Sequence, residues 1–294
     1  MQIHNTSRLY LTRRDTGVAA RLRRTGVVVL GKASLPEWAN FRPVNNGWSA
    51  HCGQTRNPYV RSSYLCGSSS GSGVAAAANM AAMTLGTETD GSILCPSASS
   101  RLGYDELDAA TTGEATKYIP HGGYVQFLKK DGLRGKRIGV PNGFFQGYGK
   151  TQLNVYKKHL ATMGRHHSIQ QGTSCRGEAE RFRPARPHRC PKHKWHWPRG
   201  ESAIQRLKEL NTEGLEKLMK EHQLDVIVDP NSNISSLLAI GGHTGIVVPA
   251  GYDDKGFPFG ICFGGLKGYE PRLIEMAYGL EQATKVRRPP MFKP

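Results

Sequence analysis

Apolar residues occur along the chain either in short continuous runs or with helical spacing. Short apolar runs are typical of buried strands, whereas apolar residues three and four positions apart indicate a helix with one buried face. Runs of the first kind predict strands at 27–30, 136–140, 224–230, 245–251 and 257–265. Helical patterns occupy 15–26, 74–85, 124–130, 150–163, 203–222 and 271–286. Since helices and strands alternate, the predicted class is α/β.

The ends of two predicted helices have specific signals. Asp15 is expected to be the N-cap of the first helix, and Gly26 to end it. In the last helix, Leu273, Ala277, Leu280 and Ala283 share one face, which is expected to pack on a sheet.

The pattern divides the chain into parts of different character. Residues 164–200 show neither helical nor strand periodicity and are rich in Arg, His and Pro, so they are expected to form a basic, disordered insert. Residues 15–163 and 201–294 then form one discontinuous domain, and residues 1–14 are a ragged terminus.

Charge is concentrated in two segments. The chain has 40 Lys and Arg against 23 Asp and Glu, a net charge of +17. Residues 1–32 carry +6 of this and residues 164–200 carry +7, so the remainder is nearly neutral. A basic nucleic-acid-binding protein acting through 164–200 is therefore an alternative, but nucleic acid is not the favoured partner. The chain has no apolar run of about 18 residues, so no contact with a membrane is expected.

The six cysteines are sparse and irregularly spaced, which favours reduced thiols and an intracellular location. Cys52, Cys66, Cys95 and Cys262 are expected to be small buried residues. No metal and no other cofactor is expected, because the local grouping of histidine and cysteine matches no common zinc pattern. That grouping consists of His188, Cys190, His193 and His196.

Two Gly/Ser loops flank an Ala-rich segment that is predicted to be a nearly buried helix. They are CGSSSGSG (66–73) and GTETDGS (86–92). A nucleophilic serine needs a tight turn that exposes its hydroxyl and directs backbone N–H groups at a developing oxyanion. The second loop could supply that turn, and the first could supply a hydroxyl that relays a proton. The two hydroxyls are then expected to lie within reach of each other, directly or through one relay.

The segment from Cys66 through the motif TETDGSILCP (87–96) resembles the signature of the amidase signature family, which consists of serine hydrolases with a Ser-Ser-Lys triad. The TETDGSI wording is most similar to the peptide-amidase branch and to uncharacterised plant and bacterial amidases. VVVLGKASLPEWANFR (27–42) and the three closing apolar segments from residue 224 to 285 resemble other parts of the family.

The resemblance implies a fold, a site and a substrate class. The fold would be one α/β/α domain around a mixed sheet. Ser92 would be the nucleophile and Ser68 the bridging serine, held by a cis peptide bond. The backbone N–H groups of Thr89, Asp90, Gly91 and Ser92 would form the oxyanion hole. The substrate would be a small amide or a peptide amide.

The chain departs from the family in two ways. No segment resembles the one that bears the catalytic lysine, and Lys32, the only lysine before Ser68, is expected to have a structural or solvated role. After CPSAS (95–99) the chain passes directly to a segment that resembles a later part of the family. The chain therefore looks truncated and internally deleted.

Three functions remain open at this point. The first is an amidase that acts through an acyl-serine intermediate and is impaired by the absent lysine. The second is a non-catalytic remnant, either a pseudogene product or a faulty gene model. The third is the nucleic-acid-binding protein considered above. The sequence makes no prediction of oligomeric state.

Overall fold

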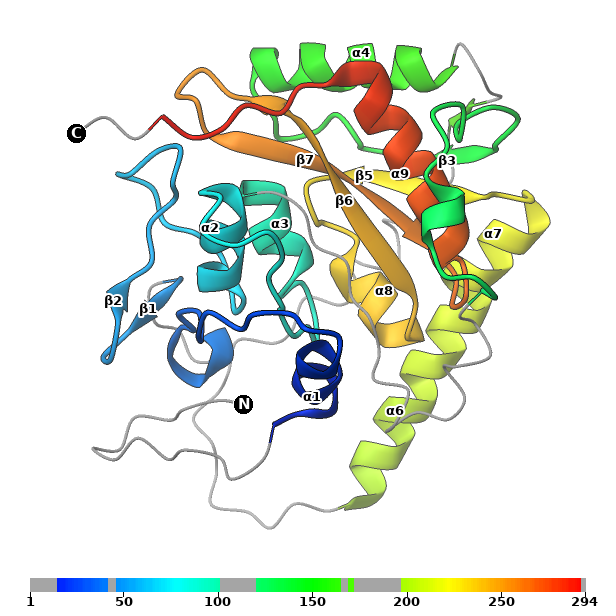
Figure 1. The fold of residues 1–294 in the computed structure, drawn as a ribbon. Helices are drawn as coiled ribbons and strands as arrows, with labels where there is room; N and C mark the ends of the chain where they lie inside the picture. Colours follow the sequence, from blue (N-terminus) through cyan, green and yellow to red (C-terminus); the bar gives the residue numbers. More distant parts are fainter. Residues whose placement is uncertain (1–14, 42–45, 101–119, 165–168, 172–196, 292–294) are drawn as a thin grey trace.

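A computed structural model describes residues 15–41, 46–100, 120–164, 169–171 and 197–291 of the chain (Figure 1). The element bounds are α1 (Gly17–Arg24), η1 (Glu37–Asn40), β1 (Trp48–Ser49), β2 (Gly53–Gln54), α2 (Ser70–Ala77), α3 (Leu94–Ser100), η3 (Val125–Phe127), β3 (Ile138–Val140), α4 (Lys150–Gly164), β4 (Ile169–Gln171), α6 (Trp197–Asn211), the π-turn η5 (Thr212–Glu216), α7 (Lys217–Glu221), β5 (Val226–Pro230), α8 (Ser235–Gly241), β6 (Thr244–Tyr252), β7 (Pro258–Gly265) and α9 (Glu270–Thr284).

The main sheet is mixed, with the strand order β4-β3-β5-β7-β6. β3 pairs in parallel with β4 and β5, whereas β7 runs antiparallel to both β5 and β6. β5 and β7 are buried along their whole length, which explains why both are predominantly apolar, with Asp229 of β5 as a buried exception. A separate two-stranded sheet is formed by β1 and β2.

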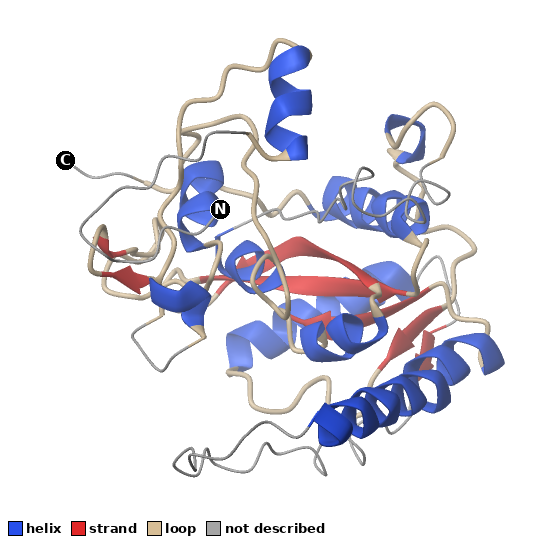
Figure 2. Cartoon of the chain, turned by 90° about the horizontal axis from the view of Figure 1, so that it is seen from below, coloured by secondary structure: helices blue, strands red, loops and turns tan. Residues whose placement is uncertain are grey.

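Helices cover both faces of the main sheet (Figure 2), so the architecture is the expected α/β/α arrangement. On one face, Tyr156 and Met163 of α4 and Leu273 and Met276 of α9 pack on the strands. On the other face, α3, α7 and α8 form a second core that includes Leu94, Met219 and Leu238. The two Gly/Ser loops lie next to this second core, because the second loop leads directly into α3 (Figure 1).

Most predicted elements of the second half are confirmed. The runs at 136–140, 224–230, 245–251 and 257–265 contain β3, β5, β6 and β7, and the predicted final helix is α9. Its predicted face is buried at Leu273, Ala277 and Leu280, but Ala283 is exposed because it lies in the last turn, at the edge of the sheet. The short helix expected at 124–130 is the 3₁₀ turn η3.

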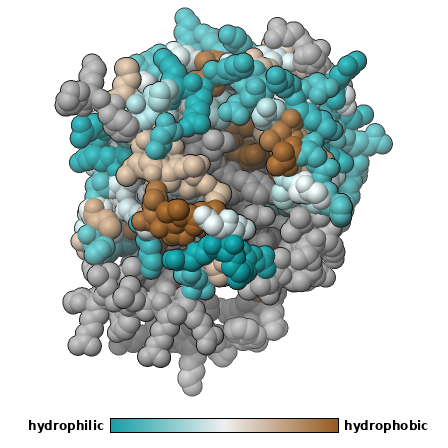
Figure 3. Space-filling model, viewed as in Figure 1, coloured by the Kyte–Doolittle hydropathy of each residue, from teal (hydrophilic) through white to brown (hydrophobic). Residues whose placement is uncertain are grey.

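The predicted strand at 27–30 is wrong. Residues 27–30 are not in a strand and their side chains are exposed, Val28 at 79% and Leu30 at 74%. No described segment pairs with this run, so its apolar character alone does not make it a strand. Exposed hydrophobic side chains also form patches on the molecular surface, as Figure 3 shows for one face of the molecule.

Two details of the N-terminal half also differ from expectation. Thr16, not Asp15, caps α1, since the Thr16 hydroxyl accepts from the Ala19 N–H; Asp15 forms an ion pair with Arg23 instead. The Ala-rich helix is shorter and less buried than predicted: α2 ends at Ala77, and Met80 is 67% exposed. The left-handed backbone of Asn79 marks the break that prevents the helix from continuing.

The expected disordered insert at 164–200 contains two regular pieces. Ile169–Gln171 forms β4, an edge strand beside β3, and α6 begins at Trp197. The expectation of no regular structure does not hold at these two places, because pairing with β3 can order a segment that lacks an alternating pattern of its own. The rest of the segment, like the terminus 1–14, lies outside the described residues. In the described part, no helix combines the length and apolar character needed to cross a bilayer.

Candidate active site

The two Gly/Ser loops are bonded to each other at the serine positions. The backbone N–H of Ser69 donates to the carbonyl oxygen of Ser92 at 3.0 Å. The Ser69 hydroxyl accepts from the Thr87 N–H at 3.2 Å and donates to the Thr87 carbonyl at 3.3 Å. Ser69, the residue after Ser68, therefore contacts the second loop near both of its ends, at Thr87 and at Ser92. Sequence reasoning missed its role, because a run of three serines gives no sign of which one makes this bridge.

Two glycines allow the first loop to approach its neighbours closely, Gly86 at the second loop and Gly71 at Ser34. A Cβ at Gly86 would lie 2.6 Å from the Ser69 Oγ and 3.0 Å from a side-chain carbon of Ile93. A Cβ at Gly71 would lie 2.3 Å from the backbone nitrogen of Ser34, whose carbonyl accepts from the Gly71 N–H at 3.0 Å. A larger residue at Gly86 would push the two loops apart, and one at Gly71 would push the first loop away from Ser34.

Ser68 and Ser92 differ in their exposure. The Gly67–Ser68 peptide bond is cis, as the family resemblance implies, and Ser68 is 3% exposed, whereas Ser92 is half-buried in the turn before α3. The Ser69 N–H joins the backbones of the two loops, and among the described residues no hydrogen bond links the Ser68 and Ser92 hydroxyls directly, so their expected proximity stays a prediction.

Glu88 organises the turn that carries Ser92. Its carboxylate accepts the backbone N–H groups of Gly91 at 2.9 Å and Leu94 at 2.7 Å, and also that of Ile93. A carboxylate is well suited to the unpaired N–H groups at the start of a helix such as α3. Sequence reasoning missed this residue, although an acidic residue just before a helix was the available signal.

The Glu88 contacts change the expected oxyanion hole. The Gly91 N–H already donates to Glu88, so it is not free to bind an oxyanion in this structure. Gly91 also has a φ of 74°, a left-handed conformation that suits glycine in a tight turn. Among the described residues, no acceptor engages the N–H groups of Thr89, Asp90 or Ser92.

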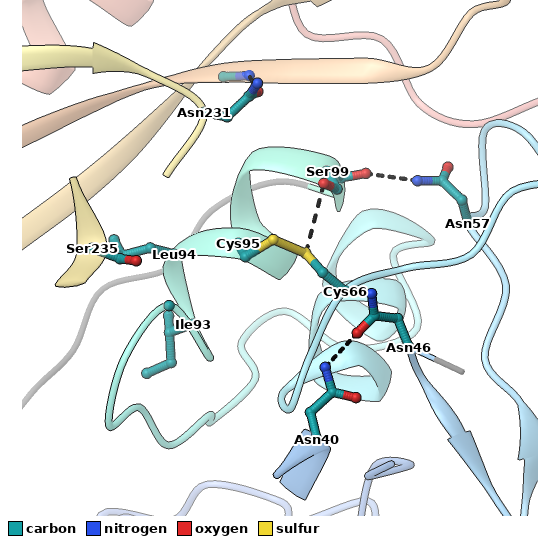
Figure 4. Close-up of a disulfide and its surroundings, with 12 residues drawn as sticks. Asn40, Asn46, Asn57, Cys66, Ile93, Leu94, Cys95, Ser99, Asn231 and Ser235 are labelled. Carbon is teal, nitrogen blue, oxygen red and sulfur yellow. Dashed lines mark hydrogen bonds between the residues drawn. A yellow bond between two sulfur atoms is a disulfide. The ribbon is translucent and has the colours of Figure 1, made fainter. Parts of the chain in front are cut away.

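A disulfide joins the two loops just outside the serines. Cys66, two residues before Ser68, is bonded to Cys95, three residues after Ser92 (Figure 4). The expectation of reduced thiols is therefore wrong for this pair, since the fold brings the two Cα atoms to 6.1 Å although they are far apart in sequence. Cys262 is buried as expected, but Cys52 is exposed.

Burial raises the pKa of the Cys262 thiol far above its usual range, with smaller contributions from the nearby Asp229 and Glu88 carboxylates. Cys262 is thus kept as a neutral thiol and is not a candidate nucleophile.

Neither Lys32 nor a metal-binding cluster is joined to the two serines in the described part of the chain. Lys32 is exposed and, within the described part of the chain, donates no hydrogen bond to Ser68 or Ser92. No described group of three or more His, Cys, Asp or Glu is arranged to hold a metal ion. The histidine and cysteine grouping considered above, at 188–196, lies outside the described residues.

Comparison with known proteins identifies relatives. The family model described as Amidase matches residues 6–102. A probable amidase of Arabidopsis thaliana is 37% identical over 376 aligned positions, which cover 95% of this chain and 72% of the plant protein. The aligned positions exceed the 294 residues of this chain, so the plant protein has internal residues that this chain lacks.

Two solved structures share the fold. The X-ray structure of the native peptide amidase from Stenotrophomonas maltophilia superposes with a TM-score of 0.79 at 30% identity, covering 95% of this chain and 78% of that one. A peptide amidase in complex with the competitive inhibitor chymostatin gives a TM-score of 0.75 at 29% identity, covering 95% and 79%.

Proposed function

The chain belongs to the amidase signature family, and we propose that its reaction is hydrolysis of a carboxamide C–N bond through an acyl-Ser92 intermediate. The observation that carries the proposal is the hydrogen bond from the Ser69 N–H to the Ser92 carbonyl, since it places the Ser68 loop against the proposed nucleophile.

The reaction has two halves. The Ser92 Oγ attacks the amide carbonyl carbon while its proton passes toward Ser68, and the resulting oxyanion is bound by the N–H groups of Thr89, Asp90 and Ser92. The proton then reaches the leaving nitrogen, the C–N bond breaks, and the amine or ammonia departs. Water attacks the acyl-serine in the second half, releasing the carboxylic acid and restoring the Ser92 hydroxyl.

The proposed substrate is a small amide or a peptide amide. Support comes from the similarity to peptide amidase structures, one of which holds the inhibitor chymostatin.

A polypeptide of these 294 residues is proposed to be impaired. A serine hydroxyl is a weak nucleophile at neutral pH without a base, and a positioned base contributes about 10²–10⁴-fold. No segment of residues 1–294 resembles the family's lysine-bearing segment, and Lys32 is exposed. The oxyanion donors alone would assist only a substrate with a good leaving group.

The test compares two substrates on the 294-residue protein. A peptide amide is expected to remain intact, while p-nitrophenyl acetate is hydrolysed slowly in a reaction that Ser92→Ala removes and the exposed-site control Ser62→Ala does not. Ester hydrolysis that persists in Ser92→Ala would refute Ser92 as the nucleophile. Rapid, Ser92-dependent hydrolysis of the peptide amide would refute the impairment and make Lys32→Ala the next variant.

A further inference from the structure

The carboxylate of Asp90 is held by two serines from a distant part of the chain. The Ser235 hydroxyl donates to Asp90 Oδ1 at 2.9 Å and the Ser236 hydroxyl donates to Asp90 Oδ2 at 2.8 Å. Both are hydrogen bonds to a charged acceptor, which are stronger than bonds between neutral groups. Each carboxylate oxygen thus has its own donor, and we call this pair of bonds the Asp90 clamp.

The clamp is built on a fixed element. Ser235 and Ser236 begin α8, which is anchored in the second core by Ile234 and Leu238, at 7% and 3% exposure. A Cβ placed on Gly91 would lie 3.1 Å from the Ser235 Oγ, so the hydroxyl also packs beside the residue that precedes Ser92. Figure 4 shows Ser235 beside the segment that leads into α3.

The Asp90 clamp contacts the same turn whose backbone N–H groups are proposed to bind the oxyanion. Glu88 already engages the Gly91 N–H from one side, which leaves Asp90 as the contact that fixes the other side of the turn to α8. Backbone donors stabilise an oxyanion only when they are held in position before the reaction. A turn fixed from both sides meets that requirement.

We propose that Ser235 and Ser236 are positioning residues that hold the Asp90 carboxylate and thereby fix the backbone N–H groups of the Ser92 turn. The catalytic part of this inference rests on the proposed function, whereas the structural part does not.

Hydrogen exchange of the peptide 86–95 tests the structural part without any activity. The double variant Ser235→Ala/Ser236→Ala is expected to exchange this peptide at least about tenfold faster than wild type, because the turn opens more often when one side is released. Ser232→Ala, in the loop before α8, is the matched control and is expected to exchange it at the wild-type rate. Unchanged exchange in the double variant would overturn the proposal.

Labelling of Ser92 by a fluorophosphonate tests the catalytic part. The double variant is expected to label about tenfold more slowly than wild type, and the same two changes made in an Asp90→Ala background are expected to cost less than about twofold, since the shared contact is then already absent. An unchanged labelling rate, or an equal loss in both backgrounds, would overturn the positioning role.

The two arms also separate the inference from the function on which it rests. Wild-type protein that is labelled at a serine other than Ser92 would contradict the proposed function. The exchange arm would still decide whether the clamp holds the turn.

Discussion

The backbone N–H of Ser69 donates a hydrogen bond of 3.0 Å to the carbonyl oxygen of Ser92. This hydrogen bond connects the two Gly/Ser loops. It places the loop of the buried Ser68 next to the turn that carries the half-buried Ser92. Four further contacts stabilise this arrangement. They are the hydrogen bonds of the Ser69 hydroxyl and of the Glu88 carboxylate, the Cys66–Cys95 disulfide and the Asp90 clamp.

Gly86→Ala is expected to destabilise the protein by about 1–3 kcal/mol, because the added Cβ would lie too close to the Ser69 Oγ and overpack the junction of the loops. Gly149→Ala is the matched control, since nothing lies within 4 Å of a Cβ at that position. Urea unfolding of both variants measures the difference. Equal stabilities would mean that the loops accommodate the methyl group.

Cys66→Ala is expected to lower the free energy of unfolding by about 2–4 kcal/mol, because the disulfide closes a loop with a sequence separation of 29 residues. Dithiothreitol should destabilise the wild type by a similar amount and leave Cys66→Ala unchanged. The control is Cys52→Ala, which removes an exposed free cysteine. A wild type that is insensitive to dithiothreitol under unfolding conditions would contradict the pairing.

Burial of His159 predicts that stability falls as the pH drops below about 6.5, the usual pKa of an unfolded histidine. Burial lowers the pKa of His159, partly opposed by its hydrogen bond with the Ala250 carbonyl at 2.7 Å. The His159 Nδ1 has no partner among the described residues, so a second proton would be a buried charge without an acceptor. The unfolded chain therefore binds this proton more tightly than the folded protein.

The pH dependence can be assigned with one variant. His159→Gln keeps a side-chain donor for Ala250 and is expected to reduce the loss of unfolding free energy between pH 7 and 5. Some dependence should remain, because burial also lowers the pKa of His243. His51→Gln, at an exposed position, should retain the wild-type profile. An identical profile in His159→Gln would show that His159 does not carry the effect.

The second half of the fold was predictable because its patterns are unambiguous. The runs that became β5, β6 and β7 are mostly apolar and separated by clear turns, and α9 shows regular spacing at Leu273, Ala277 and Leu280. The run at 27–30 has the same composition but no described strand beside it. Strand formation depends on a pairing partner, which a local pattern does not contain.

The site was predictable only in part. The family resemblance indicated Ser68, Ser92 and the cis peptide bond, whereas Ser69, Glu88 and the Asp90 clamp emerged only from the structure. The Ser69 and Asp90 contacts join positions far apart in sequence, so no spacing rule reveals them. The Cys66–Cys95 disulfide was not predicted from the sequence for the same reason.

The site of fluorophosphonate modification, determined by peptide mass spectrometry, shows directly whether Ser92 is the nucleophile. We predict a slowly formed adduct on Ser92 in wild-type protein and no adduct in Ser92→Ala, because the oxyanion donors remain although the base is absent. An adduct on a different serine, or one that forms equally in Ser92→Ala, would contradict the assignment of Ser92 as the nucleophile.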